Sequence, residues 1–532
     1  MARRTTRILT ALLAAAALAP ALAAAQPGEG FTRADSLRGS IGPARAWWDV
    51  TYYDLNVAVQ PADSSIAGHV GITYRVLQPA REMQIDLASR LQVDSVVQDG
   101  RRLAVRRDGD AMFVTMAAEQ PAGSTQTVTV HYHGKPRPAP MAPWDGGFVW
   151  TRDDVGDRWV ATAVQGLGAS AWWPNKDIQA EEPDSQRIAI TVPRGMTNVS
   201  NGRLRSTTEN TDGTTTTVWF VSSPINNYDV AVNAGTYAHF SDVYNGEKGP
   251  LTLDFYPLAI HEAVARRQFE QVKPMLQCFE RWFGPFPWYE DGFKLVETPH
   301  LGMEHQSAIA YGNGYRNGYR GTDLSGTGLG MQWDYIIIHE AGHEWFGNNI
   351  TSADIADMWV HEGFTTYSEG IYTECQQGKE AGGRYIVGQR KQITNEEPVQ
   401  GTHYGVNARG SGDMYFKGAN MLHTIRQVVG DDERWRGILR GLNETFGHGV
   451  TTGAQVQEYM SREAGVDLSR IFAQYLTSTN IPVLEYRIQN GTLSYRWTNV
   501  VPGFDMPVRV TLAPDAYELI RPTAQWLSLI HI

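Results

Sequence analysis

The feature that most constrains the fold of this chain is a pair of histidines four residues apart, His339 and His343, with Glu340 between them. Apolar residues at 335–338 and 345–346 flank the pair, which is typical of a buried helix. Residues i and i+4 lie on one face of a helix, so both imidazoles can bind the same metal ion. Glu340 lies beside that face, where it can reach a water molecule but not the metal itself.

A second glutamate, Glu362, follows His343 after 18 intervening residues, in another stretch that reads as helix. It can complete a set of two histidines and one glutamate, which leaves a fourth metal position open for water. An open position is typical of a catalytic zinc site, whereas structural sites are closed. Coincidence is the alternative, but ionisable groups are costly in an apolar core unless they are paired or bind a metal. We therefore predict one Zn²⁺ per chain, bound by His339, His343 and Glu362, with Glu340 as catalytic base.

The length and charge of the chain limit what surrounds this site. A chain of 532 residues is long enough for about three or four domains. Its formal net charge of -11 argues against nucleic acid and against anionic membranes as partners.

The first 25 residues have the pattern of a secretory signal peptide. Arg3, Arg4 and Arg7 precede an apolar run at 8–19, and small residues lead to Gln26. An uncleaved anchor is the alternative, but the run is short and weakly hydrophobic. No other stretch could span a bilayer. We expect an exported protein, periplasmic or secreted, with no membrane anchor once the signal is cleaved.

Two cysteines, Cys278 and Cys375, are present in the whole chain. An oxidising compartment would allow one disulfide between them. Two isolated thiols in the core are equally compatible with the sequence.

The pattern along the chain predicts an α+β multidomain fold. Residues 26–46 are rich in Gly, Pro and Ser and read as a linker. Residues 47–245 alternate apolar with polar in several runs, among them 229–235, which predicts an antiparallel β domain. Residues 246–482 have a mainly helical pattern, with a kink or break predicted at Pro274, and form the predicted catalytic domain. Strand patterns return at 483–526, which we interpret as a short C-terminal β module.

The last six residues, 527–532, resemble the translation of a sequencing-library adapter. We expect that the natural protein continues past Trp526 and that the C-terminal module is truncated. A genuine short tail is the alternative.

Three further motifs accompany the predicted zinc ligands. They are Gly302-Met303-Glu304, Tyr415-Phe416-Lys417-Gly418 and Trp172-Trp173-Pro174-Asn175-Lys176-Asp177. With these motifs the chain resembles the aminopeptidase N and leukotriene hydrolase family of gluzincin metallopeptidases, over about residues 47–482. The resemblance implies a thermolysin-like catalytic domain.

The resemblance also implies roles for individual residues. Glu304 would bind the free ammonium group of a peptide, with Gly302 and Met303 beside it in the substrate strand. Tyr415 would stabilise the oxyanion of the reaction intermediate. Gln165 could line the same pocket, although a solvated loop glutamine is nearly as compatible.

Four more residues either differ from the family pattern or are expected near the metal. Leu301 and His305 depart from the family's Gly-x-Met-Glu-Asn pattern, which affects the expected shape of the first specificity pocket. Glu369, two helical turns after Glu362, could orient a metal ligand or pair with a surface cation. His361 is expected near the metal but not as a fourth ligand, because adjacent helical positions do not converge.

We predict a zinc-dependent aminopeptidase that acts on peptides with a free N-terminus. A thermolysin-like endopeptidase is an alternative, but it would gain nothing from a buried anion at Glu304. An inactive peptide-binding relative is another alternative, although the ligands, Glu340 and Tyr415 are all present. No residue requires the epoxide hydrolase activity of one family branch.

Overall fold

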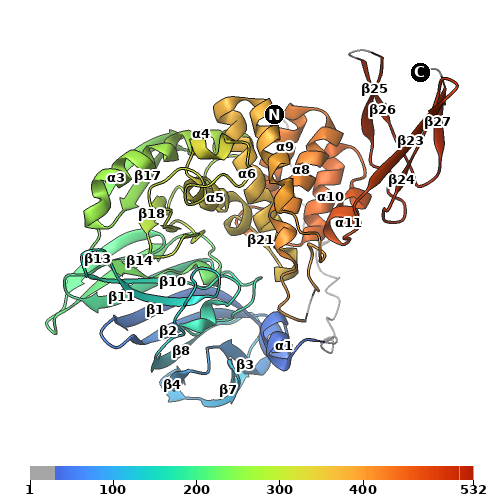
Figure 1. Ribbon diagram of the computed structural model, residues 1–532. Helices are drawn as coiled ribbons and strands as arrows, with labels where there is room; N and C mark the ends of the chain where they lie inside the picture. Colours follow the sequence, from blue (N-terminus) through green and yellow to red (C-terminus); the bar gives the residue numbers. More distant parts are fainter. Residues whose placement is uncertain (1–29, 404, 514–515, 531–532) are drawn as a thin grey trace, which may run out of the picture.

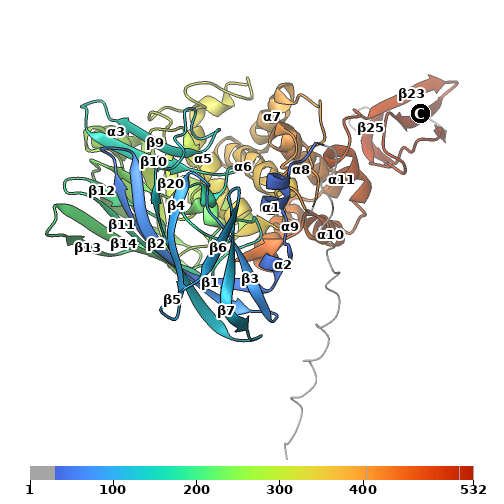
Figure 2. The same ribbon diagram turned by 90° about the horizontal axis from the view of Figure 1, so that it is seen from below.

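The computed structural model describes residues 30–403, 405–513 and 516–530. Figures 1 and 2 show a β-rich N-terminal part in blue to green, a helical part in yellow to orange, and a small red β module at the C-terminal end. This order of parts confirms the predicted fold class. The predicted signal peptide at 1–25 lies outside the described residues.

Three β-sheets make up the N-terminal domain. The largest has eight strands in the order β13-β14-β11-β1-β2-β8-β4-β5, and smaller sheets have the orders β3-β7-β6 and β12-β15-β10-β9. The strands of the large sheet are β1 (Trp48–Gln60), β2 (Ser65–Val76), β4 (Leu91–Gln98), β5 (Arg101–Arg102), β8 (Thr125–Gly134), β11 (Ser185–Pro193), β13 (Arg203–Glu209) and β14 (Thr214–Val221). Those of the smaller sheets are β3 (Ala80–Asp86), β6 (Ala104–Asp108), β7 (Ala111–Gln120), β9 (Gly147–Arg152), β10 (Arg158–Ala163), β12 (Thr197–Val199) and β15 (Asn233–Gly235).

The alternating sequence pattern explains which face of the large sheet is buried. Strand β1 buries Tyr53, Leu55 and Val57 on one face, as a period of two residues requires. It pairs antiparallel with β2 and parallel with β11, so the sheet is mixed and not purely antiparallel as predicted. The strand predicted at 229–235 is also shorter than expected, because only Asn233–Gly235 (β15) is extended, after a helical turn at Asn227–Asp229.

The helical domain begins with a five-stranded sheet of its own and continues as packed helices. The sheet has the order β16-β17-β18-β20-β19, and β21 pairs in parallel with β22 farther on. These strands are β16 (Phe240–Gly246), β17 (Gly249–Tyr256), β18 (Phe293–Glu297), β19 (Gly302–Met303), β20 (Ile309–Tyr311), β21 (Ile350–Ser352) and β22 (Gly449–Thr451). The helices are α3 (Glu262–Gln268), α4 (Val272–Phe283), α5 (Tyr335–Gly342), α6 (Trp359–Gln377), α7 (Lys379–Gly388), α8 (Phe416–Val429), α9 (Asp432–Phe446), α10 (Gly453–Ala464) and α11 (Ser469–Leu476).

The helix break predicted near Pro274 lies just before this residue. Helix α3 ends at Gln268, a short turn follows, and α4 begins at Val272. Pro274 is therefore in the first turn of α4, where its missing N–H has no acceptor within the helix.

A disulfide joins Cys278 in α4 to Cys375 in α6, with 6.1 Å between the two Cα atoms. Of the two possibilities that the sequence left open, a disulfide or two isolated thiols, the structure has the disulfide. Helix α6 carries Glu362, so the bond ties the predicted metal-binding helix to its neighbour.

The C-terminal module consists of two small sheets beyond the helical domain (Figure 1). One has the order β23-β24-β27 and the other pairs β25 with β26. The strands are β23 (Val483–Gln489), β24 (Thr492–Thr498), β25 (Val508–Ala513), β26 (Ala516–Ile520) and β27 (Leu527–Ile530). Strand β27 falls in the predicted adapter-derived tail, and whether that tail is natural stays a prediction.

The segment predicted as a linker, 26–46, contains two short helices in its described part, α1 (Arg33–Gly39) and α2 (Pro43–Ala46). Helix α1 starts at a capping box, in which the Thr32 side chain accepts from the Asp35 backbone and the Asp35 carboxylate from the Thr32 backbone. None of its residues is buried. Residues 33–42, which we call the strap, follow the surface between the two large domains.

No helix among the residues that the structure describes is both long and apolar enough to cross a membrane.

Candidate metal centre and active site

Helix α5 begins at a carboxylate whose hydrogen bonds are well satisfied. Asp334 caps the helix, and its Oδ1 accepts from the backbone N–H of Ile336 at 3.1 Å. The Tyr311 hydroxyl and the Gln268 amide donate to Oδ2 at 2.7 Å each, and Asn313 donates to Oδ1 at 2.8 Å. Burial raises the pKa of Asp334 to about 6 in spite of these donors. Such a cap fixes where the helix starts.

The end of α5 orients His343. Its Nδ1 donates to the carbonyl of Phe346 at 3.0 Å, which leaves the Nε2 lone pair available to a metal. The chain can turn back in this way because Gly347 has φ +129°, in the left-handed region that favours glycine. A Cβ at Gly347 would also lie 3.2 Å from Nδ1 of His343.

Helix α6 supplies Glu362 and lies close to α8. A Cβ on Gly418 of α8 would lie 2.9 Å from the Cα of Gly363, so the two backbones meet without side chains between them. This contact places Tyr415, just before α8, beside the metal-binding residues. Its hydroxyl donates to Oε1 of Glu362 at 2.9 Å.

His339, His343 and Glu362 converge as a buried group whose ligand atoms lie within 4.8 Å of one another. Oε2 of Glu362 is 3.7 Å from Nε2 of His339 and 3.3 Å from Nε2 of His343. That oxygen is buried without a hydrogen-bond partner. Two imidazole nitrogens and a carboxylate oxygen aimed at one point fit a Zn²⁺ ion that keeps a fourth position open.

The predicted support for His339 is present. Its Nδ1 donates to Oε1 of Glu369 at 2.8 Å, and Tyr385 and Gln389 donate to the other carboxylate oxygen at 2.7 and 2.8 Å. Glu369 is thus a ligand-orienting carboxylate and not a surface ion pair. His361 lies outside the ligand group, and its Nε2 accepts from the backbone N–H of Ser352 at 2.9 Å.

Glu340 lies beside the ligands and is 7% exposed. Burial raises its pKa to about 7; His339 and His343 oppose this rise, and Glu304 and Glu362 add to it. A pKa near the working pH is the range that suits a general base. A Cβ on Gly302 would lie 2.7 Å from Oε1 of Glu340, so the glycine keeps room beside this carboxylate.

Glu304, which directly follows strand β19, is brought to the same place. Its carboxylate oxygen, a nitrogen of His343 and an oxygen of Glu340 lie within 4.8 Å of one another. Gln165 donates to Oε1 of Glu304 at 2.5 Å, and Tyr228 donates to the same oxygen at 2.9 Å. Gln165 therefore lies at the site and not in solvent. We call Glu304, Gln165 and Tyr228 the amine anchor.

Sequence reasoning missed Tyr228. It lies 76 residues before Glu304, in a helical turn of the N-terminal domain. The available signal is weak: an aromatic hydroxyl in the polar run at 226–229, just before apolar residues at 230–232.

The remaining predicted residues have mainly packing roles. Met303 is buried and packs with Ala163 and Ala310. His305, which departs from the family pattern, is fully buried, and this burial lowers its pKa to about 3. The loop at 172–177 ends at Asp177, whose carboxylate accepts from the backbone and hydroxyl of Ser170 at 3.0 and 2.5 Å. This loop stabilises the N-terminal domain beside the site.

A β-rich domain joined to a helical domain, with a buried His-His-Glu group beside a second glutamate, defines the class of zinc-binding metallopeptidases called gluzincins. Two models of one family match the chain. The Peptidase M1 N-terminal domain matches residues 50–228, and the Peptidase family M1 domain matches residues 267–475. The chain belongs to peptidase family M1, which confirms the resemblance seen in the sequence.

The individual proteins to which the chain is similar are distant in sequence. "Probable aminopeptidase 1" of Sulfurisphaera tokodaii is 22% identical over 67% of this chain and 44% of its own length. "Aminopeptidase B" of Rattus norvegicus is 25% identical over 54% of this chain and 43% of its own length. The chain thus spans about half the length of the relatives that it matches.

Solved structures share the fold more completely. The M1 zinc metallopeptidase of Deinococcus radiodurans has a TM-score of 0.68 at 20% identity, with 84% of this chain and 98% of the other covered. A mutant two-domain M1 zinc metallopeptidase bound to L-tryptophan has a TM-score of 0.71 at 20% identity, with 84% and 99% covered. These likenesses show that the two-domain fold is common to all three chains.

Proposed function

We propose that this protein is a zinc-dependent aminopeptidase that removes the N-terminal residue from peptides. The observation that carries this proposal is the amine anchor beside the ligand group. A buried carboxylate binds an ammonium through a charge-assisted hydrogen bond. With Glu304 within 4.8 Å of both Glu340 and His343, the bond to be cleaved lies about one residue from the bound amine.

His339, His343 and Glu362 would hold the zinc ion, with Glu369 fixing the tautomer of His339. When bound, zinc polarises a carbonyl and makes water nucleophilic near neutral pH.

The residues of the chain complete the chemistry. Glu340 takes the proton of the attacking water and passes it to the leaving nitrogen. The Tyr415 hydroxyl, which donates to Glu362 in this structure, is within reach of the ligand group and can donate to the developing oxyanion. Burial, followed by the nearby carboxylates, raises the pKa of Tyr415 well above its usual value, so the hydroxyl keeps its proton.

The test compares fluorogenic aminoacyl amides with the matching N-acetylated compounds, with and without a zinc chelator. We expect cleavage of the free-amine substrates alone, abolished by chelation and restored by Zn²⁺. Cleavage of the acetylated substrates would favour the endopeptidase alternative, and no cleavage of either kind would favour a peptide-binding relative.

Two variants distinguish the loss of bound zinc from the loss of the catalytic base. Glu340→Gln should be inactive but still hold about one zinc per chain, whereas His343→Gln should lose the metal, as measured by atomic absorption. Glu374→Gln, on α6 in an ion pair with Arg426, is the matched control and should keep both properties.

We also propose that the protein is exported to the periplasm or secreted. The disulfide between Cys278 and Cys375 supports this, because such bonds persist in oxidising compartments. Fractionation of cells and sequencing of the N-terminus would test the proposal, and an intact Met1 in the cytoplasmic fraction would refute it.

A further inference from the structure

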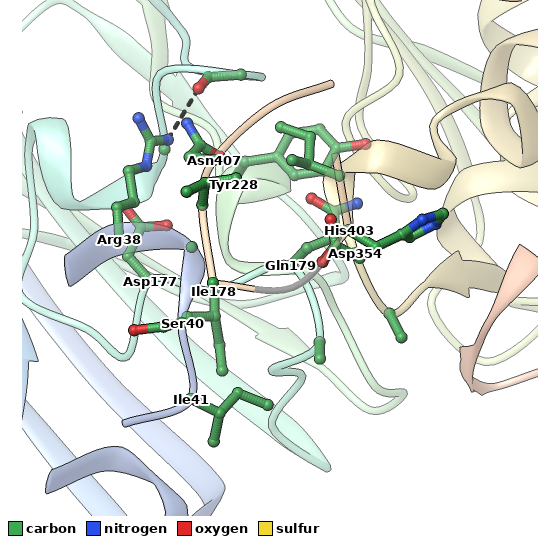
Figure 3. A pocket seen from close by; sticks show the side chains of 18 of the residues that line it. Arg38, Ser40, Ile41, Asp177, Ile178, Gln179, Tyr228, Asp354, His403 and Asn407 are labelled. Atoms are coloured by element: carbon green, nitrogen blue, oxygen red, sulfur yellow. Dashed lines mark hydrogen bonds between the residues drawn. The ribbon is translucent and has the colours of Figure 1, made fainter. Parts of the chain in front are cut away.

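A cavity of about 340 Å³ lies beside the amine anchor (Figure 3). Tyr228 contributes to its lining, and the hydroxyl of Tyr228 donates to Glu304. Gly166, which also lines it, directly follows Gln165, the second donor to Glu304. The cavity and the amine anchor thus share a wall.

The strap forms another wall of this cavity through residues 38–42. Arg38 donates from Nη2 to the carbonyl of Gly166 at 2.9 Å, which Figure 3 shows as a dashed line. Gly39 packs so closely on the backbone of Val406 and Asn407 that a Cβ there would overlap them. The strap therefore connects the N-terminal domain to the catalytic domain across the cavity. It also lies outside the ranges that the family models match, 50–228 and 267–475.

The charged groups of the lining already have partners. Arg38 is bound to Gly166, and Asp177 accepts from Ser170. Asp354 accepts from the backbone N–H of Ala356 at 2.9 Å. His403 lies 3.1 Å from the carboxylate of Asp357. The uncharged side chains of the lining are mixed. The apolar and aromatic ones are Ile41, Ile178, Tyr228, Ile355 and Val406, and the polar ones are Ser40, Gln179, Asn226 and Asn407.

We propose that the strap forms one wall of the pocket for the side chain of the first substrate residue, and that this pocket selects large apolar side chains. The inference rests on the proposed aminopeptidase function. The side chain of an N-terminal residue branches from the carbon next to the ammonium group. With the ammonium on Glu304, this side chain enters the space that adjoins the amine anchor. Leucine, methionine and phenylalanine match a lining whose charges are already paired.

Two strap variants test the wall. Gly39→Val displaces the strap from Val406, and Ile41→Asp places a carboxylate on a side chain that is 44% exposed. Neither position is in the packed core, so the fold should persist. Arg33→Met is the matched control: Arg33 also lies in the strap, but its side chain is 71% exposed and outside the cavity lining.

The assay measures kcat/KM for Ala, Leu, Phe, Arg and Glu amides that differ only in this side chain. Wild type should prefer Leu and Phe. Gly39→Val should lower the ratio of Leu to Ala about tenfold, because apolar contacts in such pockets are worth this much. Ile41→Asp should raise the ratio of Arg to Leu by a similar factor, and Arg33→Met should change neither ratio by more than about twofold.

The results distinguish failure of the strap inference from failure of the proposed aminopeptidase function. If wild type cleaves free-amine substrates but both strap variants keep its ratios, the strap is not the wall and the aminopeptidase function stands. A wild-type preference for Arg or Glu would refute the apolar substrate class. If wild type cleaves none of the amides, the proposed function fails and the inference with it.

Discussion

Replacing Tyr228 by phenylalanine removes one hydroxyl from the carboxylate that we propose to bind the substrate amine. In the structure this hydroxyl donates to Oε1 of Glu304 at 2.9 Å, and Gln165 donates to the same oxygen at 2.5 Å. Burial, followed by nearby Asp229 and Glu304, raises the pKa of Tyr228 well above its usual value. The hydroxyl therefore donates at every assay pH, and the effect of the substitution should not depend on pH.

The expected loss follows from the strength of this bond. A hydrogen bond to a charged group contributes about 1.5–3 kcal/mol. Because Gln165 still donates to the same oxygen, we expect the lower end of the range, about a tenfold fall in kcat/KM. The assay is the hydrolysis of a Leu amide by wild type, Tyr228→Phe, Glu304→Gln and the double variant. In the Glu304→Gln background, Tyr228→Phe should cost less than about twofold, because the carboxylate it supports is gone.

Tyr315→Phe is the matched control, since its hydroxyl donates to the carboxylate of Glu297 at 2.6 Å, outside the ligand group. It should change kcat/KM by less than about twofold. Equal losses from Tyr228→Phe in both Glu304 backgrounds would refute the reasoning, because Tyr228 would then act through the fold and not through Glu304.

Three further predictions concern the metal, the pH dependence and the disulfide. Glu369→Gln should lower zinc affinity about 10–100-fold in a competition assay with a chelator, whereas Glu374→Gln should leave it unchanged. The pKa of Asp334 is raised to about 6 in the folded chain, so its contribution to stability is full below about pH 4 and is lost as the pH rises through 6. Urea unfolding at pH 4 and pH 8 should therefore show Asp334→Asn gaining up to about 3 kcal/mol relative to wild type at the higher pH. Replacing Cys278 and Cys375 together by alanine should lower the unfolding free energy by about 2–4 kcal/mol, measured by denaturant titration, and leave zinc bound.

The ligand group could be predicted from sequence because it depends on local geometry. His339 and His343 share a helical face by their spacing alone, and the second helix had a visible apolar pattern around Glu362. The third ligand, Glu362, was predicted from its spacing after the histidine pair in the motif, and the orienting role of Glu369 from its position two helical turns after Glu362. Fold class followed from the change between two-residue and helical patterns along the chain.

The features that could not be predicted from the sequence depend on contacts between segments that are far apart in the chain. Tyr228 and Glu304 meet because two domains pack together, and no spacing rule links them. The glycines, prolines and serines of residues 26–46 predict an irregular linker. In the structure, a capping box starts a short helix in the strap, and contacts with Gly166 and Val406 hold the strap in place. The disulfide between Cys278 and Cys375 likewise could not be predicted from the sequence, because it depends on how α4 and α6 lie relative to each other.

The contact of Gly363 with Gly418 has a consequence for how the proposed active site would accommodate different peptides. Backbone touches backbone there, so the distance between the α6 and α8 backbones that carry Glu362 and Tyr415 does not depend on intervening side chains. We therefore expect the part of the site formed by α6 and α8 to be rigid. We expect adaptation to substrates of different shape to come instead from the strap, whose residues 38–42 line the cavity together with 405–407. Sequence drift among close relatives should accordingly be slow at the two glycines and fast along the strap.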